Sequence, residues 1–252
     1  MLVLNNFQEM DVVMDKPIVI VLSDKLRKLD RYLIMKHIQS RSSKDNVPAK
    51  IFDDWLNKQE NVSLPNNVVL RFTTLKDGFS SLLSASAHLP YYIIASPEWA
   101  ARLFLFDSEA TRNAFTITIG HEITHLDGDF PNTKLTRNDK KFVNWVNEVH
   151  ADFGAAEKMV EYNRQKLIDS MQYKMDAKKK PKCKLLNNFI KKALNLLHSD
   201  EYTHPTWETR LDYATNYNFD KELINEIATK TGCTNETLIR EICVYYKSIV
   251  LK

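Results

Sequence analysis

The segment His121-Glu122-Ile123-Thr124-His125 contains the residues of this chain whose types and spacing best suit metal chemistry. On a helix, positions four apart lie on one face, one turn apart, so two histidines with this spacing can bind the same metal ion. The glutamate beside the first histidine can then reach a metal-bound water rather than the metal. The segment therefore predicts a Zn2+ site that activates water, and an amphipathic helix with two incidental histidines is the alternative.

A helix is expected to carry this segment. Apolar side chains recur at steps of three and four over Asp107–Leu126, as they do in a helix with a buried face. Asp107 or Ser108 can cap its start, and Gly128 stands just past its end. The two histidines therefore fall on the final turns of a helix, where the metal chemistry requires them.

A second predicted helix supplies a third metal ligand. Apolar residues repeat at helical steps from Phe142 to Val160, and we expect this buried stripe to pack on the first helix. Glu148 and Asp152 lie on the neighbouring stripe, which faces the metal. Because a catalytic zinc usually takes three protein ligands, Glu148 is the predicted third ligand. Asp152 is placed to accept a hydrogen bond from the free N–H of His121, and a solvated acidic face is the alternative for both carboxylates.

The order of these motifs resembles the gluzincin zinc metallopeptidases, and most closely the family typified by the CAAX prenyl protease and HtpX. Members of that family combine H-E-x-x-H with E-x-x-A-D, which reads here from Glu148 to Asp152. They also carry a downstream H-P-x-x-x-x-R, which reads here from His204 to Arg210. A weaker match is Ala87–Ile94, which stands where the family has a strand ahead of the catalytic helix. The resemblance covers roughly residues 85–215.

The resemblance implies a set of site residues with named roles. By analogy with the family, Zn2+ is bound by His121, His125 and Glu148. Glu122 is then the general base that activates water. His204 is a second catalytic residue, which helps to stabilise the oxyanion that develops during hydrolysis.

The residue types alone leave the roles of other positions open. A histidine before a proline is often a core residue or the start of a helix, so His204 takes its active-site role from the resemblance only. Arg210 is either an ion-pair partner that holds the His204 segment down or a surface arginine on the next helix. His150 points away from Glu148 around the helix, and we interpret it as structural.

Two departures from the family leave the subfamily and the substrate open. The spacer between His125 and Glu148 is short for this family and closer to the thermolysin-like spacing, and the membrane-spanning segments of its best-known members are missing. In gluzincins an edge strand beside the catalytic helix aligns an extended peptide substrate by main-chain pairing. Tyr91–Ala95 is either such an edge strand or an ordinary strand of the sheet.

Composition and charge narrow the possible function classes. The chain has 252 residues, 44% of them hydrophobic, so it can bury a substantial core as one domain or as two closely packed halves. A net charge of +3 gives no indication of a nucleic-acid partner. The basic stretch Lys178–Lys184 is interpreted as a solvated linker, with a membrane-surface or partner contact as the alternative.

Cysteine usage and hydropathy indicate the compartment. The chain has 3 cysteines and no C-x-x-C pair, which favours a reducing environment. No segment approaches the run of about eighteen apolar residues that spans a bilayer, and the N-terminus lacks the pattern of a signal peptide. We therefore expect a soluble, cytoplasmic protein without a membrane span, whose oligomeric state the sequence leaves open.

Local patterns predict both strands and helices. Apolar, β-rich runs predict strands at Ile18–Leu22, Val68–Thr73 and Tyr91–Ala95. Helical patterns lie between them over Asp24–Ile38 and Ala49–Lys58, and loops are expected over 40–48 and 60–67. After Asp107 the pattern is almost wholly helical, with one helix over 185–197 and three more that begin near Pro205, Asp220 and Thr234.

Together these patterns predict a helix-rich α+β chain with a zincin-like metallopeptidase fold, formed as a single domain over residues 1–252. An α/β half over about 1–130 would contain the H-E-x-x-H helix, a helical half over about 131–252 would follow, and the metal would lie between them. The predicted function is that of a zinc-dependent endopeptidase with a protein or peptide substrate. The alternatives are a catalytically silent zinc-binding regulatory or peptide-binding protein on the same fold, and a non-catalytic helical domain that binds no metal.

Overall fold

The computed structural model describes residues 19–20, 28–41, 47–57, 61–62, 68–72, 79–82, 91–106, 108–131, 135–157, 163–179 and 200–250. Its helices are α1 (Lys28–Arg41), α2 (Ala49–Asn57), α3 (Pro97–Leu105), α4 (Glu109–Gly128), α5 (Arg137–Glu157), α6 (Arg164–Lys179), α8 (Asp200–Thr203), α9 (Trp207–Asn216), α10 (Lys221–Thr231) and α11 (Glu236–Val250). Its strands are β1 (Val19–Ile20), β2 (Asn61–Val62), β3 (Val68–Phe72), β4 (Phe79–Leu82) and β5 (Tyr91–Ala95). The described chain is rich in helix and poor in strand, which confirms the helix-rich class.

Most predicted elements are present, with shifted ends. α1 continues to Arg41 and so takes the first two residues of the loop expected over 40–48, and β2 takes two residues of the loop expected over 60–67. The three helices expected near the C-terminus are α9, α10 and α11. Strand β4 and helix α3 have no counterpart among the predictions, because each is short and lacks a clear periodicity. The helix expected over 185–197 lies outside the described residues.

A three-stranded sheet has the order β3-β5-β4. β5 pairs in parallel with β3 and antiparallel with β4, so it is the central strand. The interpretation of Tyr91–Ala95 as a substrate-binding edge strand is therefore wrong, and its interpretation as an ordinary strand of the sheet is confirmed. Ile93 and Ala95 of this strand are buried in one core cluster with Phe115 and Ile119 of α4.

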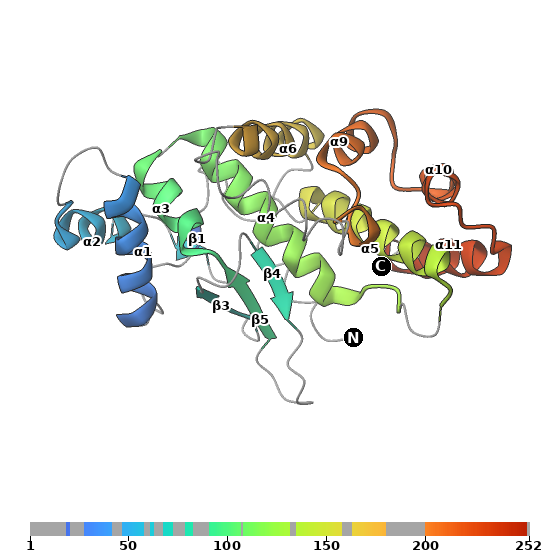
Figure 1. Ribbon diagram of the computed structural model, residues 1–252, viewed down its shortest axis with the longest axis horizontal. Helices are drawn as coiled ribbons and strands as arrows, with labels where there is room; N and C mark the ends of the chain where they lie inside the picture. The colour runs from blue at the N-terminus through green and yellow to red at the C-terminus, as the bar shows by residue number, and fades with distance from the viewer. Residues whose placement is uncertain are drawn as a thin grey trace, which may run out of the picture.

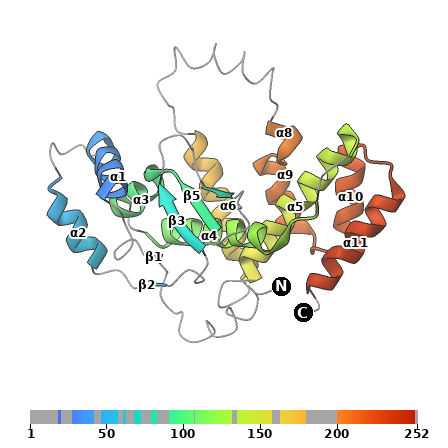
Figure 2. The ribbon, with the colours of Figure 1, turned by 90° about the horizontal axis from the view of Figure 1, so that it is seen from below.

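Helix α4 runs through the middle of the molecule, between α6 and the sheet (Figure 1), and the strands lie across it when the molecule is seen from below (Figure 2). Every residue from Ala114 to Thr124 is buried, so the middle of this helix meets protein on all its faces. Ser108 caps its start by accepting a hydrogen bond from the backbone N–H of Thr111 at 3.3 Å. Gly128 is the last residue of the helix rather than the residue after it.

Small residues let α4 and α5 approach closely. A Cβ added at Gly120 of α4 would stand 3.2 Å from backbone atoms of Ala155 in α5. A Cβ added at Gly154 would stand 2.6 Å from Cγ2 of Thr124, a separation that real Cβ atoms do not show. Larger side chains at either glycine would push the helices apart, so this contact sets the distance between α4 and α5 beside the two histidines.

The face of α5 that meets α4 is not the apolar stripe. That stripe packs on α10 and α11, together with residues that include Leu223, Ile227 and Ile242. The prediction that the stripe packs on the first helix is therefore wrong for Phe142, Val146, Val149 and Phe153. Ala156 lies in a core cluster with Ile117 of α4, and Val160 lies outside the described residues. The physical reason is that α10 and α11 offer large apolar partners, whereas the closest approach to α4, at Gly120 and Gly154, admits only small side chains. The neighbouring stripe, with Glu148 and Asp152, consequently faces α4.

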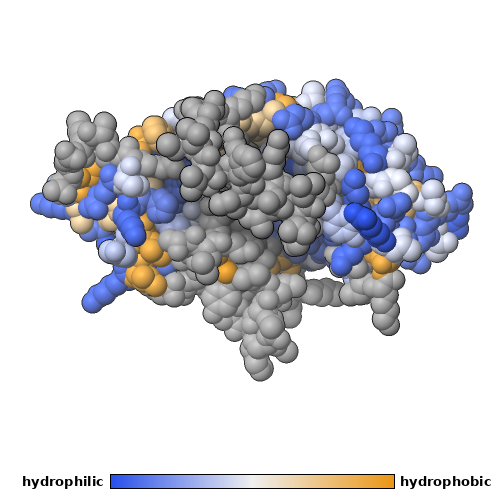
Figure 3. All heavy atoms as spheres, in the orientation of Figure 1, coloured by the Kyte–Doolittle hydropathy of each residue, from blue (hydrophilic) through white to orange (hydrophobic). Residues whose placement is uncertain are grey.

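Hydrophilic residues predominate over α9, α10 and α11 on the face drawn in Figure 3. Among the helices that the structure describes, none combines the length and the apolar character needed to cross a bilayer. Cys233 and Cys243 are free thiols. Of the basic stretch Lys178–Lys184, only the first two residues are described, at the end of α6.

Candidate metal centre

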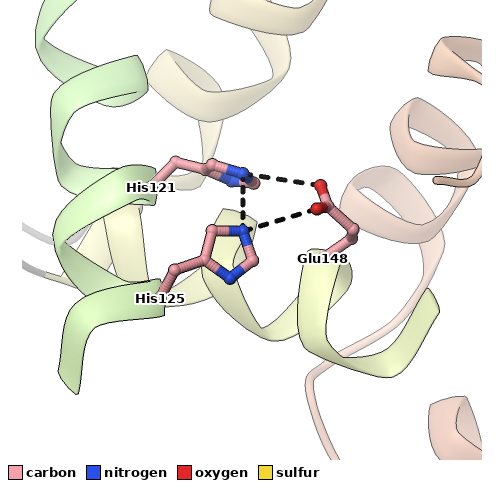
Figure 4. Close-up of side chains that lie close together, drawn as sticks. All are labelled: His121, His125 and Glu148. Carbon is pink, nitrogen blue, oxygen red and sulfur yellow. Dashed lines mark hydrogen bonds and ion pairs between the residues drawn. The ribbon is translucent and has the colours of Figure 1, made fainter. Parts of the chain in front are cut away.

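Three side chains from two helices converge at one point (Figure 4). His121 and His125 project from α4, and Glu148 projects from α5. The Nε2 atoms of the two histidines lie 3.1 Å apart, and each lies 3.5 Å from one carboxylate oxygen of Glu148. All three ligand atoms lie within 4.8 Å of one another. The structure therefore brings the three predicted metal ligands together.

These separations fit a tetrahedral metal ion. Zinc ligands lie about 2.0–2.2 Å from the ion, which places two ligands at tetrahedral corners about 3.3–3.6 Å apart. The separations of 3.1 Å and 3.5 Å among the three ligand atoms are close to this range. Imidazole and carboxylate ligands suit zinc and also other divalent metals. The group could therefore hold a metal ion, and its geometry leaves the choice of metal open.

His121 is oriented from the interior of the protein. Its Nδ1 lies 3.0 Å from Oδ1 of Asp152, which is the predicted contact. Arg210 of α9 binds the same carboxylate at two points, with Nε donating to Oδ2 at 2.7 Å and a terminal nitrogen donating to Oδ1. Both partners are buried, so Arg210 is the predicted ion-pair partner and the surface alternative is wrong. A proton donated from Nδ1 to Asp152 leaves the lone pair of His121 on Nε2, toward the other ligands.

Asp152 and Arg210 each favour the charged form of the other. Burial raises the pKa of Asp152, but the Arg210 guanidinium and His121 outweigh burial and lower that pKa to about 2. Burial likewise lowers the pKa of Arg210, and the Asp152 carboxylate more than offsets it. Both side chains are therefore charged at neutral pH, and Asp152 is held as a hydrogen-bond acceptor for His121.

His125 is oriented by Asp129, a residue that the sequence analysis missed. Nδ1 of His125 lies 2.9 Å from Oδ1 and 3.0 Å from Oδ2 of this carboxylate. Asp129 is the C-cap of α4, and its side chain is 38% exposed. It stands four positions after His125, the same spacing that pairs the two histidines, so helical periodicity is the signal that points to it.

Glu148 carries the charge at the centre of the site. Burial raises its pKa, but hydrogen bonds with His121, His125 and His204 outweigh burial and hold the pKa well below the usual range. Burial lowers the pKa of His125, but Asp129 and Glu148 outweigh it and raise that pKa to about 10. The carboxylates thus concentrate negative charge around the imidazoles, as a site for a divalent cation requires.

His204 lies beside the three ligands but outside their group. Its Nε2 is 3.2 Å from Oε1 of Glu148, and its side chain is 54% exposed. Its Nδ1 is 2.7 Å from Oγ1 of Thr203. The hydrogen bond with Glu148 raises the pKa of His204 against the opposing effect of burial. The ring of His204 is too exposed for a core histidine. His204 also lies just before the start of α9, whose N-cap is Thr206.

Two cations, Lys174 and Arg210, lie close enough to Glu122 to interact with its charge. Glu122 is buried on α4. Burial and then the charge of Arg210 lower the pKa of Lys174 to about 8, against nearby carboxylates that include Glu122. The Lys174 ammonium lies 5.1 Å and the Arg210 guanidinium 4.3 Å from the ring centroid of Trp207. Lys174 was not predicted, because a lysine on a polar helix gives no signal in the sequence.

His150 lies away from the candidate site, as predicted. Its ring centroid is 4.3 Å from that of Tyr246 and 5.1 Å from that of Phe219, both outside the ligand group. It therefore packs in the core that α5 shares with α11, which agrees with its structural interpretation.

No protein-family model matches the chain, and no match is found among curated proteins or among solved structures. The resemblance to gluzincins therefore rests on the motifs in the sequence. The roles of the site residues rest on their chemistry and on the geometry described above.

Proposed function

We propose that this chain is a zinc-dependent endopeptidase of the gluzincin type, with a zincin-like fold. The observation that carries the proposal is the convergence of His121, His125 and Glu148, with Nδ1 of both imidazoles held by carboxylates. Two histidines and one glutamate form a recurring ligand set of catalytic zinc, which keeps a further position for water. Glu122 follows the first ligand directly, as the H-E-x-x-H chemistry requires.

Each residue of the site has a task in peptide hydrolysis. Zinc bound by these ligands would polarise the peptide carbonyl and acidify a water molecule. Glu122 would accept a proton from the attacking water and deliver it to the nitrogen of the leaving amine, a transfer worth about a hundred- to ten-thousand-fold in rate. His204 would donate a hydrogen bond to the developing oxyanion from the exposed side of the site.

A peptide substrate is supported by the strand beside α4. Within the described strands, β4 pairs with β5 on one side and has no partner on the other. α4 packs against β4, so this edge lies next to the helix that carries both histidines. An extended peptide would add to the edge by main-chain hydrogen bonds, a mode of binding that tolerates many sequences.

Metal analysis and an unbiased digest test the proposal together. We expect one zinc ion per chain and cleavage of a broad peptide library, which a chelator abolishes and added zinc restores. Glu122→Gln should keep stoichiometric zinc and lose about a hundred- to ten-thousand-fold in cleavage rate. Glu109→Gln, on the exposed start of the same helix, is the matched control and should cleave like the wild type.

The other outcomes have distinct meanings. Stoichiometric zinc without cleavage of any library peptide would favour the catalytically silent zinc-binding protein. A chain that takes up no zinc when refolded with zinc present would refute the metal centre. Normal cleavage by Glu122→Gln would remove Glu122 from the mechanism.

A further inference from the structure

The segment that follows α4 is held by buried groups that the proposed mechanism does not use. The backbone N–H of Phe130 lies 3.1 Å from Oδ1 of Asn147 and 3.2 Å from the hydroxyl oxygen of Tyr246. The amide nitrogen of Asn147 donates to the carbonyl oxygen of Phe130 at 3.0 Å, and the hydroxyl of Tyr246 donates to Oδ1 of Asn147. Both backbone groups of Phe130 are therefore fixed by side chains of α5 and α11.

Tyr245, the neighbouring residue on α11, contacts the same segment. Its hydroxyl donates to the carbonyl oxygen of Asp129 at 3.4 Å, and its ring meets that of Phe130 edge-on with centroids 5.3 Å apart. Gly128 has a φ of +141°, and a Cβ there would stand 3.0 Å from the Tyr245 hydroxyl oxygen. The turn from Gly128 to Phe130 is thus shaped around the end of α11.

The buried hydroxyl of Tyr246 is needed for hydrogen bonding rather than for packing. Tyr246 and Asn147 are both buried. Burial raises the pKa of Tyr246, so the hydroxyl keeps its proton and can donate it to Asn147. A buried polar group costs free energy unless it has partners, and a network with all partners present fixes one geometry. A phenylalanine would fill the same volume, so the hydroxyl is required only for its bonds to Phe130 and Asn147.

We propose that Asn147, Tyr245 and Tyr246 form a clamp that positions Asp129 against His125. This inference rests on the proposed function of the site as a metal centre. The clamp fixes the carbonyl of Asp129 and both backbone groups of the next residue, so the Asp129 side chain has little freedom. Its carboxylate then stays 2.9–3.0 Å from Nδ1 of His125, which keeps Nε2 directed toward the other ligands.

The clamp couples the C-terminal helix to the ligand group. Asn147 directly precedes Glu148, so adjacent residues of α5 supply one ligand and one part of the clamp. Tyr246 is 116 positions from Phe130 in the sequence, on a helix that supplies none of the three ligands. Metal affinity should therefore depend on hydroxyl groups of α11 that touch no ligand.

The first test compares two tyrosine variants by competition with a chromophoric zinc chelator. Tyr246→Phe should weaken zinc binding about tenfold, at the lower end of what loss of a group behind a metal ligand causes. Tyr213→Phe is the matched control, because Tyr213 is buried and its hydroxyl has no hydrogen-bond partner among the described residues. It should bind zinc like the wild type.

A double-mutant cycle separates positioning from a general loss of structure. If Tyr246 acts through Asp129, then Tyr246→Phe should cause no further loss of zinc affinity in an Asp129→Asn background. A purely structural role would give the same loss in both backgrounds. Equal losses in the two backgrounds, or no loss in the single variant, would overturn the inference.

The metal-free protein gives a readout that does not depend on zinc. In Tyr246→Phe the ring nitrogen NMR signals of His125 should shift while those of His121 stay in place, and the amide of Phe130 should exchange faster with solvent. If the wild type takes up no zinc, the proposed function fails while this measurement still tests the clamp. His125 signals that do not change in Tyr246→Phe would overturn the clamp.

Discussion

The two histidines of the candidate metal centre are supported in opposite ways. Behind His121 stands Asp152, whose side chain is 6% exposed and is bound at two points by the buried Arg210. Behind His125 stands Asp129, whose side chain is 38% exposed at the end of α4. One support is an ion pair between two helices in the interior, and the other is a carboxylate at the surface.

This difference separates the stability of the fold from the affinity for metal. Removing one partner of a buried ion pair leaves an uncompensated charge in the interior, which destabilises the whole fold. An exposed carboxylate is solvated with or without its partner, so its loss should affect mainly the imidazole that it orients. Changes behind His121 should therefore act first on folding, and changes behind His125 on metal binding.

The largest expected effect is that of Arg210→Ala, which leaves the buried Asp152 without its partner. We expect the free energy of unfolding of the metal-free protein, measured by urea denaturation, to fall by about 3–5 kcal/mol. Arg102→Ala is the matched control, because Arg102 also binds a carboxylate, that of Glu98 at 2.8 Å, but with both side chains partly exposed. It should cost at most about 1 kcal/mol.

Equal losses in these two variants would contradict the comparison. They would show that the ion pair behind His121 is no more important to the fold than a partly exposed pair within one helix. A large loss of unfolding free energy in Arg210→Ala alone would show that the Asp152–Arg210 pair stabilises the contact between α5 and α9.

The ligand geometry could be predicted because it depends on local spacing. Helical periodicity places His125 one turn after His121 and places Asp152 one turn after Glu148, whatever the rest of the fold. The predicted contact between Asp152 and His121 requires in addition that α5 turns this stripe toward α4, as it does. The starts of α9 and α10 were also predicted closely, and Thr206 and Asp220 at these starts are residue types that cap helices.

Helix packing could not be predicted in the same way. The apolar period of α5 shows which residues are buried but not which helix covers them, and the stripe was assigned to α4 when most of it packs on α10 and α11. The close approach of Gly120 to Ala155 determines which face of α5 meets α4, and this contact can be seen only when the positions of both helices are known. The placement of Lys174 beside Trp207 and the clamp on α11 likewise arise from tertiary contacts between distant segments.

The next expected effect is a loss of stability in acid that depends on Asp152. Its pKa of about 2 lies below the usual value of 3.8, so its stabilising contribution is complete above that usual value and is lost as the pH falls through about 2. The pH-dependent part of the difference between wild type and Asp152→Asn should therefore amount to about 2 kcal/mol. Urea denaturation of the two metal-free proteins from near-neutral pH down to about pH 2 measures it.

The direction of the pH dependence can be measured directly. The difference in unfolding free energy between the two proteins should shrink on acidification, because a protonated Asp152 and an asparagine both leave Arg210 without a charged partner. A difference that stays constant over this range would mean that Asp152 does not gain stability from its charge in the folded protein.

Asp129→Asn should have the smallest effect on the stability of the fold, and its main effect should be on zinc affinity. This variant should weaken zinc binding about tenfold in chelator competition, because the imidazole of His125 loses a charged acceptor. Its unfolding free energy without metal should fall by at most about 1 kcal/mol, as for other exposed ion pairs. Asp212→Asn, at another exposed carboxylate with a 46% exposed side chain, should change neither quantity. If Asp129→Asn destabilised the fold as much as Arg210→Ala does, the surface carboxylate would be part of the framework of the protein, and the two histidines would share one kind of support.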